Sequence, residues 1–219
     1  MWSYYGSKSK IVNLYPAPKY DTIIEPFAGS ARYSLKWFYK NIILIEKNQI
    51  IVDLWKWLQK CSPKDILSLP NLKAGDRLSK FNLTREEKIF LGFCINDGSP
   101  SPKQQMTERS SMGTKFQHKI LDTAKMLYKI KHWVIVQGDY FNVHNRTATW
   151  FIDPPYIEGG DCYKYSSLNY DLLAIWCKQR KGQCLVCENA TANWLPFKIL
   201  KMVHGGKRFS MEGLYEQNN

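Results

Sequence analysis

A tetrapeptide that follows an apolar run has the residue types for chemistry on a nucleobase: Asp153, Pro154, Pro155 and Tyr156. The amino nitrogen of adenine or cytosine is a poor nucleophile because its lone pair is delocalised into the ring, so methylation requires that both amino hydrogens be held. Asp153 supplies one acceptor, and the carbonyl oxygen of Pro154 supplies another, held rigidly because both prolines restrict the backbone. The Tyr156 ring offers a face for an extruded base. The tetrapeptide therefore indicates in-line methyl transfer by positioning and charge stabilisation; the structural alternative is an Asx-Pro turn with a packing tyrosine.

Two features earlier in the chain are typical of a nucleotide-type cofactor site. Residues 21–27 predict a buried strand, the small residues 28–31 a turn, and residues 32–39 an amphipathic helix. Small residues let a ligand approach the backbone where such a helix begins. The apolar run 42–45 predicts a second parallel strand, and Glu46 at its end is placed to hydrogen-bond ribose hydroxyls.

The pattern of strands resumes in the last third of the chain. Residues 133–136 predict a strand that leads to Asp139, a candidate partner for the adenine of a cofactor, and residues 149–152 predict the strand that delivers Asp153. A helix over 170–180, a strand over 183–187 and a terminal hairpin follow; the hairpin joins 197–203 to 212–215 across a turn at 205–208. These alternating patterns predict an α/β fold.

Residues 60–131 interrupt this pattern and predict a mostly helical insertion. Thr84 and Glu87 resemble a capping box at the start of a helix over 84–94, and a second helix is expected over 116–130. Between them, residues 96–117 form a polar stretch too long for a simple connector. Its residue types suit phosphate and base-edge contacts, or else a solvated disordered loop. The candidates for nucleic-acid contact are Lys103, Gln104, Gln105, Arg109, Ser110 and Lys115, together with Tyr163 and Tyr165 on a later polar loop expected to close over the site.

The composition of the chain favours some kinds of binding partner over others. A net charge of +12 and an isoelectric point near 9.4 favour a polyanion such as nucleic acid. No apolar run is long enough for a transmembrane helix and the N-terminus lacks a signal-peptide layout, so we expect a cytoplasmic protein.

Cys184 and Cys187 have the spacing of a metal-binding pair, but in a strand they face opposite sides and no second pair completes a zinc set. Reduced, buried thiols and no metal are therefore expected.

The order of these motifs resembles that of the Dam-like (D12 class) adenine-N6 DNA methyltransferases. It runs from a Tyr-Tyr-Gly-Ser-Lys element at 4–8, through Glu-Pro-Phe-Ala-Gly-Ser at 25–30 and an insertion, to the tetrapeptide at 153–156. The resemblance implies a Rossmann-like methyltransferase sheet with helices on both faces, S-adenosylmethionine as methyl donor, and double-stranded DNA as partner, as in restriction-modification systems. It also implies a catalytic domain over 1–59 and 132–219 and a target-recognition subdomain over 60–131.

The resemblance assigns roles by position. The target base is held by Asp153, Pro154 and Tyr156, and Pro155 completes the catalytic motif. Glu46 takes the ribose hydroxyls and Asp139 the cofactor adenine, and Tyr140 belongs to the same cofactor site. The rest of the cofactor site is Tyr4, Tyr5, Lys8, Glu25, Pro26, Phe27, Ala28, Gly29, Ser30 and Asp153.

The chain departs from that family in two ways. Ala31 stands where the family often has glycine, and the insertion is short and shows no base-reading hairpin. Cytosine N4 in DNA and adenine N6 in RNA therefore remain alternative targets, and a non-catalytic module that binds nucleic acid or cofactor is an alternative of another class. The recognition sequence, the oligomeric state and any restriction partner are left open by the sequence.

Overall fold

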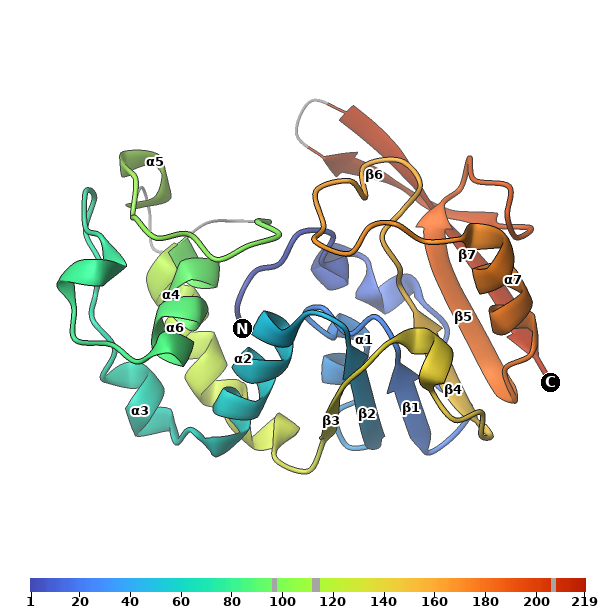
Figure 1. Cartoon of the computed structure of the whole chain (residues 1–219), viewed down its shortest axis with the longest axis horizontal. Coiled ribbons are helices and arrows are strands. Elements are labelled where there is room, and N and C mark those ends of the chain that lie inside the picture. Colours follow the sequence, from blue (N-terminus) through green and yellow to red (C-terminus); the bar gives the residue numbers. More distant parts are fainter. Residues whose placement is uncertain (96–97, 112–114, 206–207) are drawn as a thin grey trace. The chain divides into compact units, whose positions relative to one another are not determined.

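The computed structural model describes residues 1–95, 98–111, 115–205 and 208–219. The chain forms two compact units: the first comprises Met1–Ser9 and Gln49–His132, and the second Lys10–Asn48 and Trp133–Asn219 (Figure 1). The first unit thus takes in the N-terminal segment and residues 49–59, which the resemblance assigns to the catalytic domain. The functional division at residues 59 and 132 remains a prediction.

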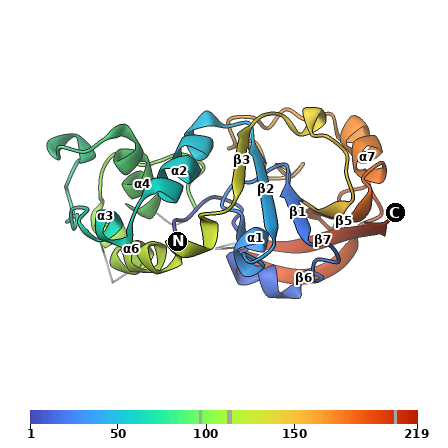
Figure 2. The ribbon, with the colours of Figure 1, turned by 90° about the horizontal axis from the view of Figure 1, so that it is seen from below.

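Within the described residues, seven strands of the second unit form one sheet in the order β3-β2-β1-β4-β5-β7-β6 (Figures 1 and 2). The five strands from β3 to β5 are parallel, and the β6–β7 hairpin is joined to β5 by antiparallel pairing of β7. Apolar, β-branched residues dominate the central strands, as buried parallel strands require. The strands are β1 (Thr22–Glu25), β2 (Asn41–Glu46), β3 (Val134–Gln137), β4 (Ala148–Ile152), β5 (Gly182–Asn189), β6 (Lys198–Gly205) and β7 (Arg208–Asn218).

Helices cover both faces of this sheet. Trp150 and Phe151 are consecutive on β4, so their side chains point to opposite faces. The Tyr33 ring of α1 (Arg32–Lys36) stacks on Phe151 at 4.3 Å, whereas the Trp176 ring of α7 (Tyr170–Lys178) meets Trp150 edge-on at 5.7 Å. The predicted α/β fold with helices on both faces is confirmed.

The first unit is helical around an aromatic core. The Trp2 ring lies 5.8 Å from Trp55 and 5.0 Å from Phe93, and all three side chains are buried. The predicted capping box is present, since the Thr84 and Glu87 side chains each accept the other's backbone N–H, at 3.3 and 2.7 Å. The helices are α2 (Gln49–Lys60), α3 (Pro63–Leu67), α4 (Arg85–Ile95), α5 (Glu108–Ser111) and α6 (Lys115–Met126). Short 3₁₀ turns span Lys8–Lys10, Val12–Leu14, Leu78–Lys80, Leu127–Ile130 and Tyr140–Asn142.

Three local expectations differ from the structure. The predicted helix over 32–39 ends at Lys36, α3 was not expected at all, and part of the polar stretch 96–117 is helical in α5, whereas α6 matches the helix expected from residue 116. Other described residues of that stretch are attached to their unit by backbone hydrogen bonds, including Met106 N to the Asp76 carbonyl at 2.9 Å and Lys103 N to the Gly92 carbonyl at 3.0 Å. Residues 96–97 and 112–114 of the stretch, and 206–207 of the hairpin turn, lie outside the described residues.

Two features are absent from the described part of the chain. No described helix is both long and apolar enough to cross a membrane. No group of three or more His, Cys, Asp or Glu side chains among the described residues is arranged to hold a metal ion. All six cysteines are free thiols, and Cys184 and Cys187 are buried in β5.

Candidate active site

The strand order creates a switch point between β1 and β4. From β1 the chain moves outward through β2 to β3, and from β4 it moves the opposite way to β5. Ligands of open α/β sheets bind at the carboxyl ends of the strands at such a point. The turn at 28–31 follows β1 and Asp153 follows β4, so both predicted motifs lie at this edge of the sheet.

The turn after β1 has the tight backbone that a close ligand approach requires. Gly29 and Ala31 both adopt positive φ, 44° and 43°, and Ala31 N bonds to the Ala28 carbonyl at 2.7 Å. A left-handed conformation strains a residue with a Cβ atom, which is why glycine suits position 31 and why alanine, the smallest alternative, is tolerated. The turn is tied to β2 through Ala28 N, which donates to the Ile45 carbonyl at 3.1 Å.

Glu46 joins the end of β2 to this turn. Its Oε2 accepts from Gly29 N at 3.0 Å and its Oε1 accepts from Asn48 N at 2.8 Å. Burial raises the pKa of Glu46 above its ordinary value, although these backbone hydrogen bonds oppose the rise. The backbone of Lys47 also hydrogen-bonds to Glu46. A carboxylate has about four acceptor positions, so about one remains for the ribose hydroxyls predicted for it.

Glu25 has a different environment from a ligand-exposed residue. It is 2% exposed, and its Oε1 accepts from Ser34 N in α1 at 2.7 Å. Burial raises the pKa of Glu25 to about 8, against the hydrogen bonds from Ser34 and with a further contribution from the charge of Asp153. Its contacts therefore hold α1 against β1, while Asp153 lies close enough to influence it electrostatically.

Asp139, predicted to bind the cofactor adenine, is engaged by a residue that the sequence reading did not single out. Lys47 Nζ lies 2.7 Å from Asp139 Oδ2 and 5.4 Å from the centre of the Tyr165 ring. Burial opposes ionisation of Asp139, but the hydrogen bond and charge of Lys47 lower its pKa below the ordinary value. Next to it, the Tyr140 ring stacks with Phe27 at 5.2 Å. Tyr165, predicted to contact nucleic acid, thus lies near the predicted cofactor residues.

The Asp-Pro-Pro-Tyr motif and the residue after it are held by groups from three other elements. The Tyr170 hydroxyl of α7 donates to the Pro155 carbonyl at 2.9 Å. Ile157 N donates to Glu188 Oε2 at the end of β5, at 3.3 Å, and the Tyr156 hydroxyl donates to Glu212 Oε1 on β7 at 2.6 Å. Among the described residues, no donor bonds to the carbonyl oxygen of Pro154. The role of this carbonyl as an acceptor for a base stays a prediction.

A glycine completes this loop. Gly160 is buried, and a Cβ atom built on it would lie 2.2 Å from the Tyr156 carbonyl oxygen and 3.0 Å from Tyr156 N. The chain therefore folds back onto the motif at a position that only glycine fits.

The residues that the sequence reading missed are those that hold the motif. Glu188 and Glu212 act through partners 31 and 56 residues away in the chain, at Ile157 and Tyr156. No local pattern signals such a pairing, although Glu188 stands at the end of a predicted strand, as Glu46 does. Trp194 Nε1 also donates to Glu188 Oε2, at 3.1 Å.

Of the remaining predicted residues, Pro26, Ser30 and Tyr163 lie in the second unit, where Pro26 and Ser30 are buried, and the others lie in the first unit. The roles of all of them stay predictions. Tyr4 is buried with its ring 5.7 Å from Phe93, Tyr5 is partly exposed, and Lys8 Nζ donates to the Gly6 carbonyl at 3.3 Å. The side chains of the nucleic-acid set are mostly exposed: Lys103, Gln104, Gln105, Arg109 and Lys115 are exposed, and Ser110 and Tyr163 are half-buried.

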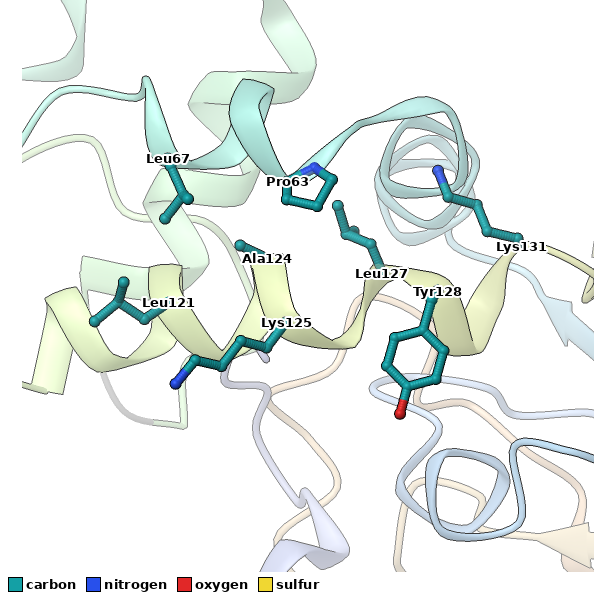
Figure 3. Close-up of a pocket in the computed structure, with 8 residues that line it drawn as sticks. All are labelled: Pro63, Leu67, Leu121, Ala124, Lys125, Leu127, Tyr128 and Lys131. Carbon is teal, nitrogen blue, oxygen red and sulfur yellow. The ribbon is translucent and has the colours of Figure 1, made fainter.

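The first unit also carries an apolar pocket between α3 and the C-terminal half of α6 (Figure 3). No residue predicted for catalysis, cofactor or nucleic acid contributes to it. Its lining is Pro63, Leu67, Leu121, Ala124, Lys125, Leu127, Tyr128 and Lys131.

Comparison with known proteins gives only distant likenesses. No protein-family model matches the chain, and no curated protein does. Among solved structures, a conserved hypothetical protein of Streptococcus pyogenes is similar at 13% identity and a TM-score of 0.39, over 90% of this chain and 86% of that one. A protein of Escherichia coli described as a candidate methyltransferase, yhhF, is similar at 12% identity and a TM-score of 0.38, over 90% of this chain and 75% of that one. Likeness at this level does not identify an activity.

Proposed function

We propose that this protein is an S-adenosylmethionine-dependent methyltransferase that acts on the N6 amino group of adenine in DNA. The observation that carries the proposal is the placement of the Asp-Pro-Pro-Tyr motif after β4, at the switch point beside the Gly29 turn. A base acceptor site and a cofactor turn are then neighbours on one edge of one sheet, as a direct transfer between two ligands requires.

The residues of this edge fit the proposed cofactor. Glu46 has about one acceptor position left for a ribose hydroxyl beside the bonds that it makes to Gly29, Asn48 and Lys47. Ala28 and Gly29 offer little side-chain bulk, and Phe27 and Tyr140 present stacked rings. When bound, the cofactor supplies an electrophilic methyl group.

The protein groups do the positioning. The Asp153 carboxylate and the Pro154 carbonyl each accept one amino hydrogen, which directs the nitrogen lone pair out of the plane of the base. The carboxylate also stabilises the positive charge that develops on the nitrogen. Tyr156 packs against one face of the base and limits its tilt. Because no covalent intermediate forms, the rate depends on how well these three groups are held.

The same acceptors suit two other targets. Cytosine N4 presents an exocyclic amine of the same kind, and adenine N6 in RNA differs only in the backbone that carries it. The net charge of +12 supports a nucleic acid in each case, and the choice of adenine in DNA rests on the family resemblance. In the alternative of another class, the chain binds cofactor or nucleic acid without catalysis.

The test uses methyl-labelled S-adenosylmethionine with unmethylated duplex DNA, single-stranded DNA and RNA in parallel reactions. We expect label in DNA. Label in RNA alone would support the methyl-transfer reaction but would identify RNA, not DNA, as the substrate. Cofactor binding by calorimetry without transfer to any of the three would contradict the proposed activity and favour the binding module.

A further inference from the structure

Two tyrosine hydroxyls converge on one buried carboxylate behind the proposed base site. Glu212 on β7 is 6% exposed, and its Oε1 accepts from the Tyr15 hydroxyl at 2.6 Å and from the Tyr156 hydroxyl at 2.6 Å. The three residues come from the segment before β1, the loop after β4 and the C-terminal hairpin, all within the second unit.

Tyr15 is itself fixed by packing. It is 3% exposed, and its ring meets Phe151 of β4 edge-on at 5.0 Å. Phe151 in turn stacks on Tyr33 of α1 at 4.3 Å. Glu212 therefore connects the Tyr156 hydroxyl, through Tyr15, to the packed core on one face of the sheet.

This arrangement is costly for stability alone. Taking a carboxylate out of water costs several kcal/mol before hydrogen bonds offset it, and apolar residues of similar size often serve stability as well or better. Burial, together with the charges of Asp153, Cys187, Glu212 and Tyr15, raises the pKa of Tyr156 well above its ordinary value. The Tyr156 hydroxyl therefore remains a donor throughout the neutral pH range.

We propose that Glu212 is a positioning residue that, together with Tyr15, fixes the plane of the Tyr156 ring against which the target base stacks. The inference rests on the proposed function. A hydrogen bond at the far end of a phenol restrains both rotation and tilt of the ring, which χ1 and χ2 alone leave adjustable. A misplacement of about 1 Å in a reacting group costs about 100-fold in rate, so this restraint acts on the chemical step.

The first experiment compares Glu212→Leu, Glu212→Gln and Tyr156→Phe with wild type in methyl transfer to the nucleic acid that wild type modifies. We expect Glu212→Leu to lower kcat about 10- to 100-fold while the Kd for S-adenosylmethionine changes less than about twofold. Glu212→Gln keeps a side-chain oxygen that can accept both hydroxyls and is expected to retain most of the rate. Glu216→Gln, on the same strand and the same face, is the matched control and keeps wild-type kcat.

A double-mutant cycle separates positioning from loss of packing. If Glu212 acts through the Tyr156 hydroxyl, Glu212→Leu combined with Tyr156→Phe is no slower than the slower single variant. Fully additive losses would overturn the coupling. A second readout is the fluorescence of 2-aminopurine in place of the target base, since an extruded base stacked on a fixed ring is quenched more strongly in wild type than in Glu212→Leu.

The outcomes distinguish this inference from the proposed function. Wild-type methylation with an unchanged kcat in a folded Glu212→Leu variant would overturn the positioning role alone. If Glu212→Leu does not fold, Tyr15→Phe, which keeps the carboxylate and the Tyr156 bond, must lower kcat severalfold, or the role is overturned. Absence of methyl transfer by wild type to any nucleic acid would overturn both.

Discussion

At the scale of single residues, the candidate site depends on which hydrogen-bond acceptors already have a donor within the protein. The Pro155 carbonyl oxygen accepts a hydrogen bond from the Tyr170 hydroxyl, and the Tyr156 hydroxyl donates to Glu212, so the motif is anchored at two points. The Pro154 carbonyl, in contrast, bonds to no donor in the described part of the chain. Adjacent residues thus differ in role: two groups anchor the loop, and the Pro154 carbonyl is the acceptor that the proposed function assigns to a base.

Glu46 gives a prediction at this scale. Glu46→Ala removes the proposed ribose acceptor and the partner of Gly29 N, and a charge-assisted bond of this kind contributes about 1.5–3 kcal/mol. We expect the Kd for S-adenosylmethionine, measured by calorimetry, to rise about 10- to 100-fold. Asp21→Asn, at the opposite end of β1, is the control and should leave it unchanged. A wild-type Kd in Glu46→Ala would remove Glu46 from the cofactor site.

At the scale of elements, the site is made by strand ends and the loops that leave them. Every strand from β1 to β5 contributes: the Gly29 turn after β1, Glu46 and Lys47 after β2, Asp139 after β3, the motif after β4 and Glu188 at the end of β5. The loop after β4 is the one in which we expect a substitution to be tolerated least, because the backbone at Gly160 lies directly against the backbone of Tyr156.

Gly160→Ala tests that close approach. The added methyl group would lie 2.2 Å from the Tyr156 carbonyl oxygen, and because the obstacle is backbone, the motif itself must move. We expect at least a tenfold loss of kcat and a Tm lowered by several degrees in a thermal melt. Gly138→Ala, whose methyl group would meet Ile45 at an ordinary 3.6 Å, is the control for the melt. An active, equally stable Gly160→Ala variant would show that the loop adapts.

Most of the strands and helices could be predicted from the sequence, but the long-range hydrogen bonds that hold the site residues could not. Runs such as Ile42–Ile45 predict strands because β-branched residues fit buried parallel sheets, and Thr84 with Glu87 predicts a helix start because both capping partners are local. The five-residue α3 is too short to show a helical period. The role of Glu212 could not be identified from the sequence, because its partners Tyr15 and Tyr156 lie 197 and 56 residues away. The three residues come together only when β7 pairs with the rest of the sheet.

At the scale of the whole molecule, two properties summarise the chain: buried acidic groups beneath the site, and a strongly basic surface. Glu25, Glu46 and Glu188 all have pKa values raised chiefly by burial. The net charge of +12 nevertheless favours a polyanionic partner over long range. The first property bears on stability as a function of pH, and the second on binding as a function of salt.

Glu25 predicts a pH dependence of stability. Its pKa is about 8 in the folded protein and near 4.5 when unfolded. The favourable contribution of the protonated group is complete below pH 4.5 and is lost as pH rises toward 8. Between pH 5 and 7.5 wild type should lose roughly 3 kcal/mol of unfolding free energy from this group. Glu25→Gln keeps an acceptor for Ser34 N and should lack this component in denaturant titrations. Parallel pH profiles for the two proteins would contradict the assignment.

The exposed basic residues of the polar stretch predict a salt dependence. Each phosphate contact contributes about −0.9 to the slope of log K against log salt concentration for duplex DNA. We expect Lys103→Ala with Arg109→Ala to reduce the slope by about 2 in fluorescence anisotropy titrations. Lys40→Ala with Lys178→Ala removes equal charge at the amino edge of the sheet and serves as the control. Equal slopes in the two double variants would place the phosphates elsewhere.

The central claim is that Asp153 and the Pro154 carbonyl direct a methyl group to the amino nitrogen of adenine in DNA. Its most direct test is to digest DNA treated with the protein and S-adenosylmethionine to nucleosides and to identify the methylated nucleoside by mass and chromatography. Wild type is predicted to yield N6-methyldeoxyadenosine, and Asp153→Ala to yield none while it keeps its Tm and its affinity for the cofactor. A methylated product that persists in Asp153→Ala, or methylation at a ring atom in place of an exocyclic amine, would contradict the mechanism.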